Sequence, residues 1–217
     1  MKGCGLLIFD LDGTLVDSKQ DLVAAVNATR VFMGHEPLSV SLISSYVGDG
    51  APALVQRALP LLNEPERARA LHYFLEYYRE HMLDQTTVYP GVREALDQLH
   101  AAEIALAVLT NKPVRFSVTM LERLGLDLHF FRIYGGNSFQ QKKPHPAGVQ
   151  ALMSESGVPP ERTVMVGDSA VDVLTARNAG VYACGVPWGF QPETFAAAPP
   201  DVMVSDLREL VPLVLGR

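Results

Sequence analysis

The segment that runs from Leu6 to Asp12 constrains the fold more than any other part of this sequence. Residues 6–9 are uninterrupted apolar sequence, which is typical of a parallel strand buried on both faces. Asp10 falls where this strand leaves the sheet, and Asp12 follows two residues later. The carboxyl edge of an open α/β sheet is where ligands bind. Two carboxylates so close together repel each other unless a cation lies between them or one of them holds a proton.

Apolar segments and helical patterns alternate through the rest of the chain. The expected strands cover residues 104–109, 132–134, 163–166, 181–186 and 202–204, and the expected helices between them cover residues 92–100, 114–124, 146–156 and 171–179. A last helix is expected after Asp206, which has the chemistry of a helix cap. Repeated alternation of this kind predicts an α/β fold, a doubly wound parallel sheet with helices on both faces.

The segment 17–85, which follows the first strand directly, has an entirely helical pattern. Ser18 and Asp21 have the spacing of a capping box and predict the start of its first helix. Further helices are expected near residues 39–47, 52–59 and 64–82. We therefore expect an all-helical cap domain of residues 17–85, inserted into a core domain made of residues 1–16 and 86–217.

Composition and charge exclude several classes of protein. The net charge of −6 and the lack of a basic stripe argue against a nucleic-acid partner, and the apolar runs are too short to span a membrane. The amino-terminal sequence lacks the pattern of a signal peptide, so we expect a cytoplasmic protein, either a monomer or a homodimer. Cys4 and Cys184 are the only cysteines. A bridge between them is geometrically possible, but buried reduced thiols are the simpler interpretation.

Polar residues follow three of the predicted strands, and a pair of lysines precedes one of the predicted helices. These residues are Asp10 and Asp12, Thr110 and Asn111, Asp168 and Asp172, and Lys142 and Lys143. A doubly wound topology brings strand ends together although they are distant in sequence. Carboxylates in this number suit Mg²⁺, which often shares its coordination with a substrate phosphate. The sequence therefore predicts a site for a divalent cation and an anionic, oxygen-rich group.

The same residues carry a family resemblance. In chain order, the segments DLDGT, LTN, KKP and GDSAVD resemble the four motifs of the haloacid dehalogenase (HAD) superfamily of phosphohydrolases, and the resemblance extends from Leu6 to about Val204. The helical insertion between the first two motifs is similar to that of the phosphoglycolate phosphatase branch. Within this branch the closest similarities are VGDGAPALVQRAL, TNKP, KKPHP and VPWGF.

The resemblance implies roles for the two opening carboxylates. Asp10 is the expected nucleophile, and attack of a carboxylate on phosphorus forms an aspartyl phosphate, which divides one difficult displacement into two easier ones. Asp12 is expected to protonate the leaving alkoxide and then to accept a proton from the hydrolytic water. Members that act on carbon–halogen bonds lack an acid at this position, so Asp12 favours phosphate esters as substrates.

The resemblance also implies how the phosphoryl group and the metal are held. Thr110, the backbone amide of Asn111 and Lys143 are expected to bind the phosphoryl oxygens. Mg²⁺ is the expected cofactor, bound by the carboxylates of Asp10 and Asp168 and by the backbone carbonyl of Asp12.

Two of these assignments leave a choice between neighbouring residues. Lys143 is preferred to Lys142 because Pro144 follows it and the family places the lysine next to proline. Asp172 is expected to hold Lys143, although a role as metal ligand or as a helix cap that involves Ser169 is equally compatible with the sequence.

Substrate choice is expected to depend on the cap, where Gly48, Asp49 and Gly50 are the candidate substrate-binding residues. Glycines at the start of a helix expose backbone N–H groups that bind an anion, such as the carboxylate of a small phosphorylated metabolite. Asp49 departs from the Asn expected at this position in phosphoglycolate phosphatases, and a plain loop with a helix cap is the alternative interpretation.

The leading hypothesis is a Mg²⁺-dependent phosphatase that acts on 2-phosphoglycolate through an aspartyl phosphate. The alternatives with related chemistry are a sugar phosphatase, for example for an amino-sugar 6-phosphate, a pyrophosphatase, or a phosphosugar mutase. A non-catalytic binding module is a distant alternative, because such a module would have lost the nucleophile, the acid or the lysine, and all of them are present.

Overall fold

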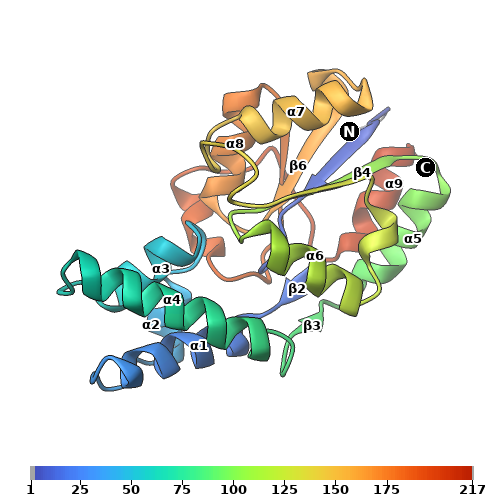
Figure 1. Ribbon diagram of the computed structural model, residues 1–217. Helices are drawn as coiled ribbons and strands as arrows, with labels where there is room; N and C mark the ends of the chain where they lie inside the picture. The colour runs from blue at the N-terminus through green and yellow to red at the C-terminus, as the bar shows by residue number, and fades with distance from the viewer. Residues whose placement is uncertain (1–2, 217) are drawn as a thin grey trace.

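The computed structural model describes residues 3–216, which form a six-stranded sheet with every neighbouring pair of strands parallel (Figure 1). The strands are β1 (Leu6–Phe9), β4 (Ala105–Leu109), β5 (Arg132–Tyr134), β6 (Thr163–Gly167), β7 (Tyr182–Gly185) and β8 (Val202–Met203). Their order is β5-β4-β1-β6-β7-β8. The chain adds β4 and β5 on one side of β1 and then returns to add β6, β7 and β8 on the other. The predicted doubly wound sheet is therefore confirmed, and its strand order reverses beside β1.

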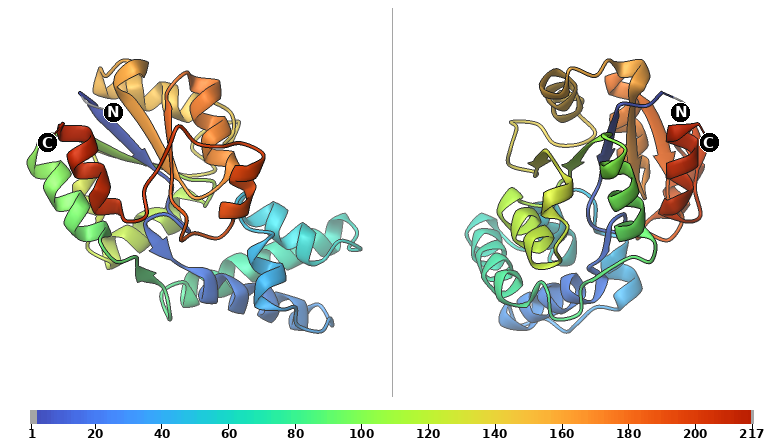
Figure 2. Two further views of the ribbon diagram at one scale, coloured as in Figure 1. Left: turned by 180° about the vertical axis from the view of Figure 1, so that it is seen from behind. Right: turned by 90° about the vertical axis from the view of Figure 1, so that its right-hand side faces the viewer.

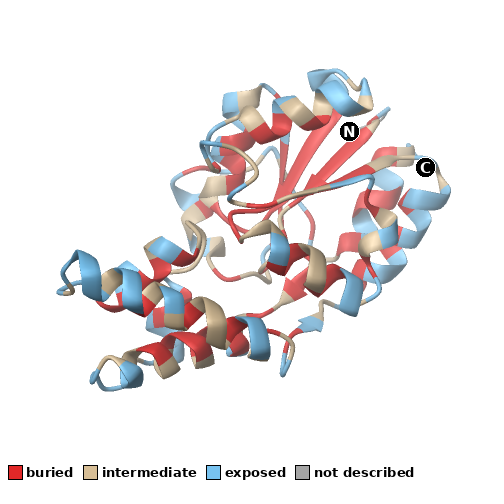
Figure 3. Cartoon of the chain, in the orientation of Figure 1, coloured by how far each residue is buried: buried red, intermediate tan, exposed pale blue. Residues whose placement is uncertain are grey.

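The central position of β1 follows from its uninterrupted apolar sequence. All four of its side chains are fully buried, with Leu7 and Phe9 in one core cluster and Leu6 and Ile8 in the other, because successive side chains of a strand point to opposite faces. The helices of this part of the chain are α5 (Val92–Ala101), α6 (Val114–Arg123), α7 (Ala147–Ser156), α8 (Ala170–Ala179) and α9 (Leu210–Leu215). Helices α7 and α8 cover one face, and α5 and α9 lie against the other (Figure 2). The buried strands are visible between these two layers in Figure 3.

Four helices follow β1 before the chain returns to the sheet, and we call residues 19–81 the cap. These helices are α1 (Lys19–Phe32), α2 (Val40–Ser44), α3 (Ala51–Ala58) and α4 (Glu64–His81). The two segments that join the cap to the sheet pair with each other as a short antiparallel ribbon of β2 (Val16–Asp17) and β3 (Thr87–Val88). This ribbon could not be predicted from the sequence, since two-residue strands have no detectable periodicity.

Helix α4 illustrates how the sequence positions the cap over the sheet. Asn63 and Glu66 form a capping box that starts the helix. Ala70, Phe74 and Tyr78 are spaced four residues apart, so they share one face, and all three are buried. Helix α4 packs against α1 and α3 (Figure 1), and Tyr78 also meets Phe116 of α6.

The capping box predicted at the start of the first helix is wrong. Ser18 is the residue before α1, but its side chain does not cap the helix and donates a hydrogen bond to Asp12 instead. The carboxylate of Asp21 accepts hydrogen bonds from the backbone of Gln85 and from both the backbone and the hydroxyl of Thr86. Both side chains thus form hydrogen bonds with other segments of the chain, in place of the local capping contacts that their spacing suggested.

The remaining expectations concern the last helix, the cysteines and the membrane. Asp206 caps a short 3₁₀ turn, Leu207–Glu209, and α9 begins after this turn rather than at Asp206 itself. Cys4 and Cys184 are both free and buried, so the interpretation as reduced thiols is confirmed. Within residues 3–216, every helix is too short or too polar to span a bilayer.

Candidate active site

A cavity lies between the cap and the carboxyl ends of β1, β4 and β6. Its floor includes the polar residues that follow these strands, and its roof is formed by apolar residues of the cap. The lining from the core comprises Asp10, Asp12, Thr110, Asn111, Lys112, Lys143, Asp168 and Asp172, and the lining from the cap includes Leu22, Val47, Gly48, Gly50, Leu54, Phe74 and Tyr78. The structure therefore brings the strand ends singled out in the sequence into one cavity.

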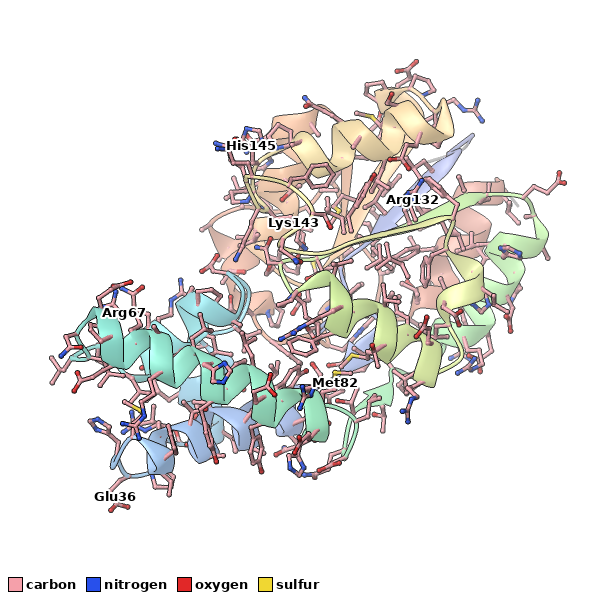
Figure 4. The ribbon with its side chains drawn as sticks, in the orientation of Figure 1. Glu36, Arg67, Met82, Arg132, Lys143 and His145 are labelled. Atoms are coloured by element: carbon pink, nitrogen blue, oxygen red, sulfur yellow. The ribbon has the colours of Figure 1, made fainter. Side chains whose placement is uncertain are left out.

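Lys143 lies at the centre of the polar floor. Its ammonium is 2.9 Å from Asp10 Oδ1 and donates a hydrogen bond of 2.7 Å to Asp172 Oδ1. Burial disfavours the charged form of this lysine, but the two carboxylates outweigh that effect and hold its pKa above the ordinary value. Lys142 is outside the lining of this cavity, and His145 lies farther out at the surface (Figure 4).

Asp172 has two tasks that the sequence analysis offered as alternatives. Its Oδ1 accepts the hydrogen bond from Lys143, and its Oδ2 accepts hydrogen bonds from the backbone and the hydroxyl of Ser169 at the start of α8. Asp172 therefore caps the helix and holds the lysine at the same time.

Asp168 is buried between two glycines at the end of β6. A Cβ on Gly13 would come within 2.4 Å of Asp168 Oδ2, and one on Gly189 would come within 2.2 Å of Asp168 Cβ. The backbone N–H of Phe190 donates to Asp168 Oδ2 at 2.6 Å. Burial, together with the nearby charges of Asp172 and Asp10, raises the pKa of Asp168 to about 8.

The donor set of this floor fits a divalent cation. One carboxylate oxygen each from Asp10, Asp168 and Asp172 lies within 4.8 Å of the others. Burial also raises the pKa of Asp10 to about 6, although Lys143 opposes this shift. With Asp12, four carboxylates face two lysines in the cavity, so the ionised site carries an excess of two negative charges. Hard carboxylate oxygens with such an excess are the ligands that Mg²⁺ prefers.

Thr110 and Asn111 follow β4 and complete the floor. Thr110 Oγ1 is buried and accepts a hydrogen bond of 3.3 Å from the backbone of Lys112. The side chain of Asn111 exchanges hydrogen bonds with the backbone of Lys143, and its amide also donates to the carbonyl of Gly48 at 2.9 Å. Asn111 thus holds two loops at the end of β4, the loop that contains Lys143 and the cap loop of residues 48–50. The sequence did not suggest this role.

Of the three candidate residues in the cap loop, the two glycines line the cavity and the aspartate does not. Gly48 and Gly50 line the cavity, whereas the carboxylate of Asp49 is paired with Arg57 on the cap and is not part of the lining. Gly50 has a φ of +86°, and a Cβ at this position would lie 2.8 Å from the carbonyl oxygen of Asn111. Only glycine therefore allows the cap loop to approach the core this closely.

The sequence did not point to the hydrogen-bonded pair of Lys112 and Tyr78 in this cavity. Lys112 is buried, and its ammonium donates to Asp12 Oδ1 at 2.8 Å, to Asp12 Oδ2 at 3.1 Å and to the hydroxyl of Tyr78 at 2.6 Å. Lys112 is part of the segment TNKP, which was used only as a similarity. Tyr78 has the spacing of a core residue on α4, and its hydroxyl gave no separate signal.

Comparison with known proteins identifies the family. Residues 7–186 match the model of the haloacid dehalogenase-like hydrolases. The chain belongs to this family. A phosphoglycolate phosphatase of Chromobacterium violaceum is 41% identical to it, over 99% of this chain and 98% of the relative. Another, from Pseudomonas fluorescens Pf0-1, is 41% identical over 95% of this chain and 78% of its own length.

Solved structures agree with the sequence relatives. The crystal structure of a predicted phosphoglycolate phosphatase from Haemophilus somnus 129PT superimposes with a TM-score of 0.94 at 33% identity, covering 98% of this chain and 99% of the other. A putative phosphoglycolate phosphatase from Lactobacillus delbrueckii gives a TM-score of 0.92 at 29% identity, with both chains covered completely. The expected family, fold and enzyme class, a phosphoric monoester hydrolase of the HAD superfamily, are confirmed.

Proposed function

We propose that this HAD-family phosphatase is a Mg²⁺-dependent hydrolase of 2-phosphoglycolate that works through an aspartyl phosphate on Asp10. The observation that carries the proposal is the convergence of Asp10, Lys143 and Asp168 on one buried floor beneath a closely fitting cap. The names of the relatives support phosphoglycolate as the substrate.

The chain's own residues supply most of the proposed mechanism. Asp10 attacks phosphorus while Lys143, Thr110 and the backbone amide of Asn111 hold the phosphoryl oxygens, where charge remains high in the transition state. Asp12 gives its proton to the leaving oxygen of glycolate. It then accepts a proton from the water that attacks the aspartyl phosphate, which releases phosphate and regenerates Asp10.

We assign the metal to the carboxylates of Asp10 and Asp168, with the backbone carbonyl of Asp12 as the third protein ligand. When bound, Mg²⁺ supplies positive charge that screens the repulsion between an anionic nucleophile and an anionic substrate. Its binding would also offset the repulsion among the buried carboxylates that raises the pKa of Asp168.

The roof of the cavity supports a small substrate. The cap residues Leu22, Val47, Leu54 and Phe74 present apolar side chains to the cavity. A sugar phosphate would bury several hydroxyl groups against this apolar wall. These hydroxyls would lack hydrogen-bond partners there, which makes their burial unfavourable. Glycolate has only a carboxylate beyond its scissile oxygen, and we place that carboxylate at the amides near Gly50, where α3 begins without a side-chain cap.

Replacement of the nucleophile tests the mechanism. Asp10→Asn is expected to reduce kcat on phosphoglycolate by more than about 10⁴-fold, while the thermal unfolding midpoint stays within a few degrees of the unmodified protein or rises. Asp84→Asn changes an exposed carboxylate in the segment that follows the cap and is the matched control. Turnover by Asp10→Asn at more than a tenth of the original rate would contradict the assignment of Asp10 as the nucleophile.

A further inference from the structure

We propose that Lys112 and Tyr78 are positioning residues that hold the carboxylate of Asp12 for proton transfer only while the cap rests on the core. The inference rests on the proposed function to the extent that Asp12 acts as the proton donor. It concerns two residues to which the proposed mechanism gives no part in phosphoryl binding or metal binding.

The first observation is the chain of contacts that ends at Asp12. The ammonium of Lys112 contacts both oxygens of Asp12, at 2.8 and 3.1 Å, so it fixes the rotation of the carboxylate as well as its position. Ser18, the residue before the cap, also donates to Oδ1. The same ammonium donates to the hydroxyl of Tyr78 at 2.6 Å, and Tyr78 belongs to α4 of the cap.

The second observation is that Tyr78 is held by packing from both sides. Its ring stacks on Phe74 of the cap with the ring centres 5.7 Å apart, and it forms a T-shaped pair with Phe116 on α6 of the core, with the ring centres 5.6 Å apart. Tyr78 is 2% exposed, and the Lys112 ammonium also lies 4.6 Å from the centre of its ring. In this docked arrangement the hydroxyl reaches Lys112 while Phe74 of the cap and Phe116 of the core hold the ring between them.

The third observation is the depth at which these groups lie. The side chain of Lys112 is 5% exposed and that of Asp12 is 12% exposed. A buried ammonium that loses one acceptor is left with an unmet hydrogen bond, so it turns toward another partner or toward water. Loss of the Tyr78 hydroxyl, or displacement of the cap, therefore loosens the hold of Lys112 on Asp12. Proton transfer requires a short and well-directed contact with the leaving oxygen, and it is sensitive to such loosening.

The test uses substrates that differ in their need for a proton. Phosphoglycolate and ethyl phosphate release alkoxides that must be protonated, whereas p-nitrophenyl phosphate releases a stable phenolate that needs no acid. Because kcat/KM reports the steps up to transfer of the phosphoryl group to Asp10, it separates the acid role of Asp12 from its later role as base. The variants are Tyr78→Phe, Lys112→Met and the double variant, with Tyr77→Phe as the matched control on the same helix.

We expect Lys112→Met to lower kcat/KM for both alkyl phosphates by about 10- to 100-fold, and that for p-nitrophenyl phosphate by less than about 3-fold. Tyr78→Phe keeps both ring contacts and should lower the alkyl values by about 3- to 10-fold. Since Tyr78 acts through Lys112, the double variant should be no slower than Lys112→Met alone. Tyr77→Phe should change none of these values. If Lys112→Met does not fold, Tyr78→Phe carries the comparison by itself.

Three results would overturn the inference. Equal losses on alkyl and aryl substrates would indicate a structural role alone. A loss on phosphoglycolate without one on ethyl phosphate would show that Lys112 binds the substrate carboxylate instead. Full multiplication of the single effects in the double variant would show that Tyr78 acts independently of Lys112. If the unmodified enzyme hydrolyses ethyl phosphate or an amino-sugar 6-phosphate but not phosphoglycolate, the proposed substrate fails, and the alkyl-to-aryl comparison still decides the inference.

Discussion

Asp21 offers a direct test of how the cap is fixed to the core. The carboxylate is 1% exposed, and it accepts hydrogen bonds from Gln85 N at 3.0 Å, Thr86 N at 2.9 Å and Thr86 Oγ1 at 2.7 Å. Asp21→Ala leaves all three donors without this acceptor. Gln85 is exposed and recruits water, but Thr86 is buried. At about 1–3 kcal/mol for each buried donor left unpaired, the two groups of Thr86 predict a loss of about 2–6 kcal/mol in the free energy of unfolding.

The measurement is urea unfolding at pH 7 followed by circular dichroism, together with thermal unfolding. For a chain of this length, about 2–6 kcal/mol corresponds to a decrease of roughly 5–20 °C in the midpoint. Asp21→Asn keeps one acceptor oxygen and should lose less than Asp21→Ala. Asp84→Asn, which changes an exposed carboxylate near the same linker, should change the free energy by less than about 0.5 kcal/mol. A loss below about 1 kcal/mol in Asp21→Ala would refute the reasoning that this buried carboxylate secures the linker.

Further predictions concern the lysine and the metal. Lys143→Met should lower kcat on p-nitrophenyl phosphate, which has no carboxylate, by at least about 10²-fold, because one donor to the phosphoryl group is lost, whereas Lys142→Met should change it by less than about twofold. Steady-state kinetics on both variants checks this, and similar effects at the two positions would contradict it. Folding without metal raises the pKa of Asp10 to about 6 and of Asp168 to about 8. The folded state therefore binds more protons than the unfolded state between about pH 4 and pH 8, and its stability falls as the pH rises through this range. Because Mg²⁺ replaces these protons, it should raise the unfolding midpoint more at pH 8 than at pH 5, and equal increases would contradict the assigned ligands.

Much of the fold could be predicted because its signals are carried by continuous segments. The four apolar residues of β1 indicated a strand buried on both faces, and the same is true of β6. The ribbon of β2 and β3 could not be predicted, since its strands are two residues long and pair only because both linkers lie side by side. The capping box at Ser18 and Asp21 failed for a related reason. Its side chains found partners at Asp12 and in the returning linker, and spacing along one helix does not report such partners.

The candidate site could also be predicted from the sequence only in part. Asp10 and Asp168 could be brought together from the sequence because parallel strands place their carboxyl ends at one edge. Lys112 and Tyr78 could not, because their contact joins positions 34 residues apart and depends on how α4 docks on the core. The pairing of Asp49 with Arg57 was also hidden, since Asp49 has the pattern of a substrate-binding or capping residue and Arg57 that of a solvated helix face.

The central claim is that the buried carboxylates and Lys143 form a metal-dependent phosphatase site whose cap selects phosphoglycolate. The most direct test is kcat/KM of the purified protein on 2-phosphoglycolate, an amino-sugar 6-phosphate, pyrophosphate and p-nitrophenyl phosphate, each with Mg²⁺ and with EDTA. We predict the highest value for 2-phosphoglycolate, by at least about tenfold, and loss of all activity with EDTA that added Mg²⁺ restores. A higher value on another phosphoester, or full activity in EDTA, would contradict the account.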